Sequence, residues 1–385
     1  MAKPPQKQGR AYYYRMRTPE KRLEKNVKFA AIAAVLLVVL LAAAFGAAQI
    51  FDRPAPETEE QTAIPVAPPE ADTPAEPAEE FAPAVIEKPE AAASGARMLR
   101  DCADCPPLVV VPAGSFAMGI QPAEDASGKV APSMAASERP LHGVTFRKPF
   151  ALEQTEVTRQ QFDAFVRDTQ YQATGCEVFD GNTWVLDRSK SWRDPGFYQD
   201  KDHPVVCVNR ADAQAYIAWL SKKAGVKYRL PTESEWEYAA RAGTSGAYVW
   251  GNDLTQACFD ANVAGSTHMN RYKGRPTSLV FACDSHHAET APVGKYRANA
   301  FGLYDMFGNV REIVADCWNP DHRNATADGA AVTTGDCDAT VARGGGWADP
   351  PANLRSARRM RAAADERRGD QGFRIARDLS DEEIP

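Results

Sequence analysis

The sequence predicts an α+β fold for residues 99–380, with little regular secondary structure. Three observations predict it. Three stretches have the capping residues and apolar spacing of helices, short apolar runs typical of β-strands lie elsewhere, and long loops rich in glycine, asparagine and tryptophan separate them. Loops of this length need covalent support in a compact domain, and the spread cysteines could supply it.

Each predicted helix begins at a side chain that can cap it. The expected N-cap residues are Thr158, Asn209 and Thr232. Thr158 and Thr232 are each followed three residues later by Gln or Glu, which completes a capping-box pattern. The second helix, over residues 211–224, is expected to end at Gly225, and the third at Gly243.

The predicted strands are short apolar runs bounded by turn residues. They are Leu108–Val111, Ser115–Met118, Val144–Phe150 and Gly372–Ile375.

The first 98 residues differ in composition from the rest. Residues 1–28 hold nine Lys or Arg and two acids, whereas residues 52–98 hold eleven acids and nine prolines. Between them, residues 29–50 carry no charge, and at about 1.5 Å per residue they span about 33 Å, enough for a bilayer core. We therefore expect a basic cytoplasmic tail at 1–28, a transmembrane helix at 29–51, a disordered linker at 52–98 and a folded domain at 99–380.

The flanking lysines and arginines orient this segment. By the positive-inside rule the N-terminus is cytoplasmic, and the domain lies outside the cytoplasm, in the periplasm of a Gram-negative cell. The alternative is a cleaved signal peptide, but the apolar run exceeds the usual length of about 7–15 residues. The net charge of −6 averages these segments and gives no reason to expect nucleic-acid binding.

All eight cysteines lie beyond the predicted membrane segment. An even number in an oxidising compartment predicts disulfides, but spacing alone leaves 105 pairings open. Cys102 and Cys105 could also be half a zinc site or a redox motif. The sequence has no second CxxC for zinc, and no strand–CxxC–helix pattern surrounds this one.

Seven motifs, in order, resemble the formylglycine-generating-enzyme family, also called the sulfatase-modifying-factor family. They are Leu108–Gly119, Ala151–Thr158, His203–Val206, Tyr228–Arg241, Asn299–Val310, Arg343–Trp347 and Gly372–Arg374. The resemblance implies a C-type-lectin-like α+β fold. It also implies a disulfide pattern, which is Cys317–Cys337, Cys258–Cys283, Cys176–Cys207 and Cys102–Cys105.

The enzymes of this family oxidise a substrate cysteine in sulfatases, using oxygen and a copper ion held by two cysteines after an Arg-Gly-Gly-Ser-aromatic motif. Here Gly346 replaces the serine, Asp349 stands near the first copper cysteine, and no cysteine follows Cys337. Because Cu(I) prefers soft thiolate ligands, we expect no copper site and assign no catalytic residue.

The iron-dependent sulfoxide synthases of ergothioneine synthesis are a second enzymatic branch. They place their iron-binding histidines largely in an extra N-terminal domain. The six histidines of this chain, at positions 142, 203, 268, 286, 287 and 322, form no HxxxH pair, so iron is not expected either.

Calcium is the cofactor that the resemblance implies. Its oxygen ligands would be the carboxylates of Asp305 and Glu312 and the backbone carbonyls of Gly308 and Val310. The alternative is a Gly-Asn turn beside a solvated acid. A second calcium loop maps onto Asn262 and Val263, but Ser285 stands where the family has an acid.

Four residues are candidates for the wall of the family cleft: Trp347, Asp349, Arg355 and Arg358. The arginines could bind an anionic ligand. Alternatively, they pair internally with nearby acids, namely Asp349, Asp365, Glu366 and Asp370. The tryptophans could line a groove or fill the core.

Together these features predict a membrane-anchored, extracytoplasmic and non-catalytic module that binds or assists a protein or glycan partner. The alternatives are a divergent formylglycine-generating oxidase or related non-haem metal oxygenase, and an assembly factor of the cell envelope. Fold resemblance cannot choose among them.

Overall fold

The structure is a computed structural model that describes residues 96–127 and 129–384. The predicted tail at 1–28, the membrane helix at 29–51 and nearly all of the linker at 52–98 lie outside these residues. Among the residues that are described, no helix is both long and apolar enough to cross a bilayer.

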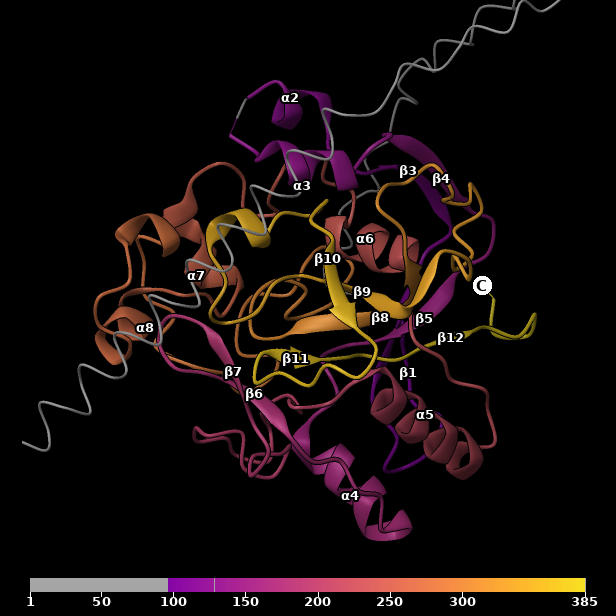
Figure 1. The fold of residues 1–385 in the computed structure, drawn as a ribbon. Coiled ribbons are helices and arrows are strands. Elements are labelled where there is room, and N and C mark those ends of the chain that lie inside the picture. Colours follow the sequence, from indigo (N-terminus) through magenta and orange to yellow (C-terminus); the bar gives the residue numbers. More distant parts are fainter. Residues whose placement is uncertain (1–95, 128, 385) are drawn as a thin grey trace, which may run out of the picture. The chain divides into compact units, whose positions relative to one another are not determined.

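Two four-stranded sheets and two hairpins form the β-structure of the described domain (Figure 1). The first sheet is antiparallel, in the order β1 (Met98–Leu99), β2 (Leu108–Val111), β5 (Phe150–Glu153), β12 (Ala376–Asp378). The second has the order β10 (Met360–Ala363), β9 (Asp336–Arg343), β8 (Arg311–Trp318), β11 (Gln371–Gly372), and only its β8–β11 pair is parallel. The hairpins are β3 (Gly114–Met118) with β4 (His142–Phe146), and β6 (Cys176–Phe179) with β7 (Trp184–Asp187).

Within the described residues, three helices are longer than two turns. They are α4 (Arg159–Thr169), α5 (Arg210–Ala224) and α6 (Glu233–Arg241). The shorter α-helices are α2 (Pro122–Asp125), α3 (Pro132–Ser137), α7 (Ala257–Asp260) and α8 (Ser266–Arg271), and the 3₁₀ turns are η1 (Leu254–Gln256), η2 (Thr277–Leu279) and η3 (Pro351–Asn353). Helices α4 and α5 pack on each other, whereas α6 contacts β3, β8 and β9 and is buried along its whole length (Figure 1).

The predicted helix starts are confirmed. Thr158, Asn209 and Thr232 are the N-caps of α4, α5 and α6, and each forms a capping box with the residue three positions later. Gly225 ends α5 in the left-handed conformation, as predicted. The predicted end of α6 is wrong by one residue, because Ala242 takes the left-handed cap position (φ 43°) before Gly243.

Two of the four predicted strands need correction. Residues 144–150 are not one strand: Pro149 has no N–H to donate, β4 pairs with β3, and β5 pairs with β2. Residues 372–375 fall mostly between β11 and β12. In this stretch, the carbonyls of Phe373 and Ile375 accept hydrogen bonds from Val157 and Glu153 instead of extending one ladder.

The eight cysteines form four disulfides in the pattern that the family resemblance implies. They are Cys102–Cys105, Cys176–Cys207, Cys258–Cys283 and Cys317–Cys337. The last three close segments whose helices and strands are short. Cys317–Cys337 also links β8 to β9 near the end of the second sheet.

Candidate binding cleft and calcium loop

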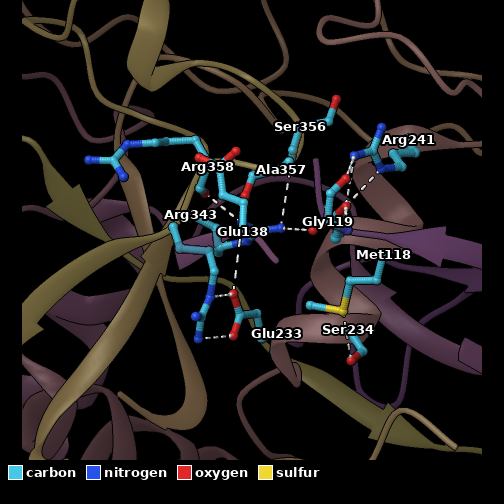
Figure 2. A network of polar contacts seen from close by, with 12 residues as sticks. Met118, Gly119, Glu138, Glu233, Ser234, Arg241, Arg343, Ser356, Ala357 and Arg358 are labelled. Carbon is cyan, nitrogen blue, oxygen red and sulfur yellow. Dashed lines mark hydrogen bonds and ion pairs between the residues drawn. The ribbon is translucent and has the colours of Figure 1, made fainter. Parts of the chain in front are cut away.

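A buried arginine holds the loop that corresponds to the copper loop of the family (Figure 2). Arg343 ends β9, has a fully buried side chain, and pairs with Glu237 of α6. Its guanidinium donates to the carbonyls of Ser356, Ala357 and Arg358. No regular secondary structure provides hydrogen-bond donors for these carbonyls. By donating to them, the arginine fixes the far end of the loop to its start.

The family has a serine in this loop, and the space that its side chain would occupy is filled in this chain. A Cβ added to Gly346 would lie 2.7 Å from the Cβ of Asp370 and 3.0 Å from its carbonyl oxygen. Asp370 is fully buried and bound by Arg368, with an Nη2–Oδ2 distance of 2.7 Å. A serine at position 346 would therefore require Asp370 to move.

Asp349 has a structural partner on each carboxylate oxygen. Oδ2 accepts from the Gly346 N–H at 2.8 Å, and Oδ1 accepts from the Asn353 side chain at 2.7 Å. The residue thus closes a tight turn at the position near the family's first copper cysteine. All eight cysteines lie in the described part of the chain and all are in disulfides, so no thiolate is available to this loop.

A cavity of about 440 Å³ opens beside this loop. Its walls come from three segments, which are the β6–β7 turn at 178–182, residues 195–197 and residues 271–275. Three of the lining residues, Phe179, Phe197 and Tyr272, pack against Trp347, with ring centroids 5.4–6.0 Å apart. An aromatic layer therefore separates the cavity from the copper-loop position.

The four predicted cleft residues have different environments. Trp347 is 1% exposed and lies beneath the cavity, not on its surface. Arg355 does not line the cleft, because its buried side chain binds Glu138 and Glu124. Arg358 donates to Asn353. The C-terminal arginines therefore have internal partners, as the alternative interpretation of these arginines predicts. Glu124 and Glu138, however, are not among the acids expected as partners.

The proposed calcium loop has oxygen atoms suited to a hard cation. Asp305 Oδ2 accepts from the Gly294 N–H, but its Oδ1 is buried and has no hydrogen-bond partner. The carbonyls of Gly308 and Val310 accept no hydrogen bond from any described residue. Glu312 is already bound at both oxygens, by Arg374 and by Trp236 Nε1. Three of the four expected ligands are therefore unsatisfied oxygens.

Charge balance at this loop also suits a cation. Burial raises the pKa of Asp305 to about 6. Burial, followed by the charges of Asp305 and Glu312, raises the pKa of Glu156. Glu156 Oε1 is a further buried oxygen without a partner, and Arg374 pairs with Glu312 of this group. The donors fit calcium, although within the described residues no three acidic, histidine or cysteine side chains converge on one point, so the carbonyls would be needed.

The second calcium loop offers fewer free oxygens than the first, although Asn262 Oδ1 is buried and has no hydrogen-bond partner. Ser285 Oγ donates to the Val263 carbonyl at 2.9 Å, so a hydroxyl occupies the position of the expected acid and satisfies one of the expected ligands. The Asn262 amide donates to Glu289 O and to Asn309. Asp284, the neighbouring acid, accepts from the N–H groups of Thr267 and His286.

The residues that form the cavity could not be recognised in the sequence. Phe179, Phe197, Tyr272 and Arg275 lie in loops or short strands up to 96 positions apart, and none belongs to a family motif. The weak signal was the aromatic content of residues 179–198.

The fold and the cleft loop define a member of the sulfatase-modifying-factor group. Residues 95–379 match the family described as "Sulfatase-modifying factor enzyme 1-like domain", and the chain belongs to this family. It is 36% identical over 303 residues to the formylglycine-generating enzyme of Streptomyces coelicolor, covering 70% of this chain and 88% of the relative.

Two further relatives are informative. The chain is 33% identical over 305 residues to "Inactive C-alpha-formylglycine-generating enzyme 2" of Bos taurus, covering 70% of this chain and 87% of that protein. Among solved structures it is similar to PvdO from Pseudomonas aeruginosa, at 36% identity and a TM-score of 0.61, covering 75% of this chain and all of that one. The relatives include a named enzyme and a named inactive protein, so membership alone does not decide whether this chain is catalytic.

Proposed function

We propose that the chain is a non-catalytic binding or accessory module of the sulfatase-modifying-factor family, acting on a protein or glycan partner outside the cytoplasm. One observation carries this proposal. Every cysteine is in a disulfide, while Asp370 fills the space behind Gly346 and Asp349 is bound at both oxygens within its own turn. A soft-metal site needs thiolates, and none is free.

The cavity supports the binding part of the proposal. It combines aromatic walls with polar and charged rims, which is the usual composition of a ligand site. Its rims are loops and a hairpin on a disulfide-linked scaffold, where binding residues commonly lie.

The decisive experiment compares metal content and turnover. The full chain, purified without chelators, is analysed for copper and iron, then mixed with oxygen and a cysteine peptide of the kind that formylglycine-generating enzymes oxidise. The Streptomyces coelicolor enzyme serves as positive control. We expect no stoichiometric copper and no oxygen consumption above the no-enzyme rate. Copper at one ion per chain, together with an aldehyde product, would refute the proposal.

We also propose a structural calcium ion at the 305–312 loop, where it would neutralise buried carboxylates and bind free carbonyls. Calcium added to the chelator-treated chain should raise its melting temperature, and titration calorimetry should give one site. Asp305→Asn should abolish both effects, since Oδ1 is the free carboxylate oxygen. Ser285→Ala is the matched control and should leave them unchanged. Absence of heat and of a thermal shift in the unmodified chain would remove the calcium site.

The membrane anchor and topology form the last part of this proposal. An uncharged run of 22 residues after a basic tail motivates them. A reporter enzyme that is active only outside the cytoplasm, fused after residue 385, should be active in cells. Activity confined to a reporter that works only in the cytoplasm would contradict this topology.

A further inference from the structure

Among residues 96–127 and 129–384, the β6–β7 hairpin has one edge without a backbone partner. On its other edge, the Glu177 N–H donates to Arg367 O at 2.7 Å, and the Gly369 N–H donates to Glu177 O at 2.9 Å. Glu177 lies opposite Leu186 in the hairpin. Opposite residues of an antiparallel pair point their backbone groups either toward each other or both away, alternating along the strand. The backbone N–H and C=O groups of Glu177 point away from β7. The corresponding groups of Leu186, which lies opposite Glu177, and of Trp184, two residues earlier, therefore point outward from β7.

Nothing in the described part of the chain covers this edge. Apart from the ladder to β6, the backbone of residues 184–186 makes no hydrogen bond to a described residue. Val185 is 47% exposed and Leu186 is 55% exposed, which places both among the exposed large apolar side chains. No proline or lysine interrupts these three residues. An edge of this kind is a template for one more strand.

The cavity lies at the turn that joins the two strands, since residues 180–182 line it. Its charged lining residues are Asp180, Arg271, Lys273 and Arg275. Arg271 also pairs with Glu289, with an Nε–Oε1 distance of 3.3 Å. The lining itself holds three cations and one acid. Glu289 and Asp349 lie next to Arg271 and Arg275, so Lys273, which forms no ion pair within the described residues, is the cation left for a negatively charged group.

We propose that an extended, acidic segment of a partner protein adds to β7 as a third strand and places a carboxylate at this cavity. Only a polypeptide offers N–H and C=O groups at the spacing of an open strand edge, so the edge selects a protein over a glycan. The positive balance of the cavity selects acidic side chains. This inference rests on the binding function proposed above and specifies the partner class of the same site.

Selection from a phage-displayed library of random ten-residue peptides, with the full chain as bait, tests the inference without a known ligand. We expect the selected peptides to be rich in Asp and Glu. Their affinities are then measured by fluorescence polarisation against the unmodified chain, Leu186→Pro and Leu186→Ala. Both variants remove the side chain, but only proline removes the outward N–H, and it leaves the ladder to β6 intact.

The expected Kd rises about tenfold in Leu186→Pro and less than about threefold in Leu186→Ala. Lys273→Glu should also weaken binding, more strongly at low salt. A second measurement needs no variant, because hydrogen exchange at the Trp184 and Leu186 amides should slow when peptide binds. Circular dichroism checks that each variant folds.

Three results would overturn the inference: no peptide is selected, the selected peptides bind Leu186→Pro as well as Leu186→Ala, or exchange at these amides does not slow. Binding of heparin or hyaluronate alone would also overturn it, while leaving a non-catalytic binding module in place. Copper-dependent oxidation, by contrast, would refute the proposed function itself and is detected by a separate assay.

Discussion

Removing the disulfide between Cys176 and Cys207 should destabilise the domain more than removing the one between Cys102 and Cys105. The first joins β6 to the residues before α5 across a sequence separation of 31, whereas the second spans a separation of only 3. In the chain-entropy model, loops of these lengths correspond to about 3.7 and about 1.9 kcal/mol of stabilisation. Cys176 and Cys207 are also fully buried, so replacing both by alanine leaves unfilled space and adds to the loss.

The assay is urea unfolding of the full chain, followed by tryptophan fluorescence, for the two double Cys→Ala variants. We expect the midpoint to fall further for the Cys176 and Cys207 variant, by a difference in unfolding free energy of about 2 kcal/mol. Equal losses, or a larger loss from the short loop, would refute the argument from loop length. The first variant should also bind selected peptides more weakly, because this disulfide fixes the base of the β6–β7 hairpin.

Three other predictions concern the cleft loop and the buried charges. Gly346→Ser should lower the unfolding free energy by about 1–3 kcal/mol, because the new Cβ meets Asp370, and should produce no oxidase activity; an unchanged urea midpoint would show that the space is free. Arg355→Ala should lower the unfolding free energy by about 3–5 kcal/mol, because it leaves Glu138 buried and unpaired. Arg361→Ala breaks an exposed pair with Asp336 and should lower it by less than about 1 kcal/mol. Similar losses for the two variants in urea unfolding would contradict this. Burial lowers the pKa of His322 to about 4, so the unfolded chain binds a proton more readily and the unfolding free energy should fall as the pH drops from about 6.5 toward 4. His322→Leu should remove about 2 kcal/mol of that loss at pH 5. Parallel stability–pH curves for the two proteins would be the contrary result.

The parts of the fold that could be predicted depend on local chemistry. A capping box needs only two side chains three residues apart, so Thr158, Asn209 and Thr232 identified their helices correctly. The disulfide pattern followed from the family resemblance, because residue spacing alone left many pairings open. The absence of thiolates at the copper loop could also be predicted, since it depends on which residue types are present.

The parts that could not be predicted depend on packing between distant segments. Strands β8 and β9 are buried over most of their length and contain register shifts, so neither shows the alternation of polar and apolar residues by which strands are recognised. Asp370 lies 24 positions after Gly346, and nothing in the sequence indicates that its side chain fills the space behind that glycine. The cavity could not be predicted for the same reason, because its walls come from three segments that meet only in the folded chain.

The copper-loop position is held by buried contacts, whereas the open edge of the hairpin is exposed. Changes at the loop should therefore affect stability, and changes at the hairpin edge should affect binding. Arg343 is fully buried and bonds to three carbonyls and a carboxylate, so its loss should unfold the loop around it. Leu186 is exposed, and its backbone groups face outward from an edge strand, so changes there should leave the fold intact. A rigid loop beneath a less constrained hairpin suits a module that binds, because the ligand meets the hairpin and the cavity while the loop only supports them. Substitutions at Leu186 should therefore change affinity at constant stability, whereas substitutions at Arg343 should change stability first and affinity only as a consequence.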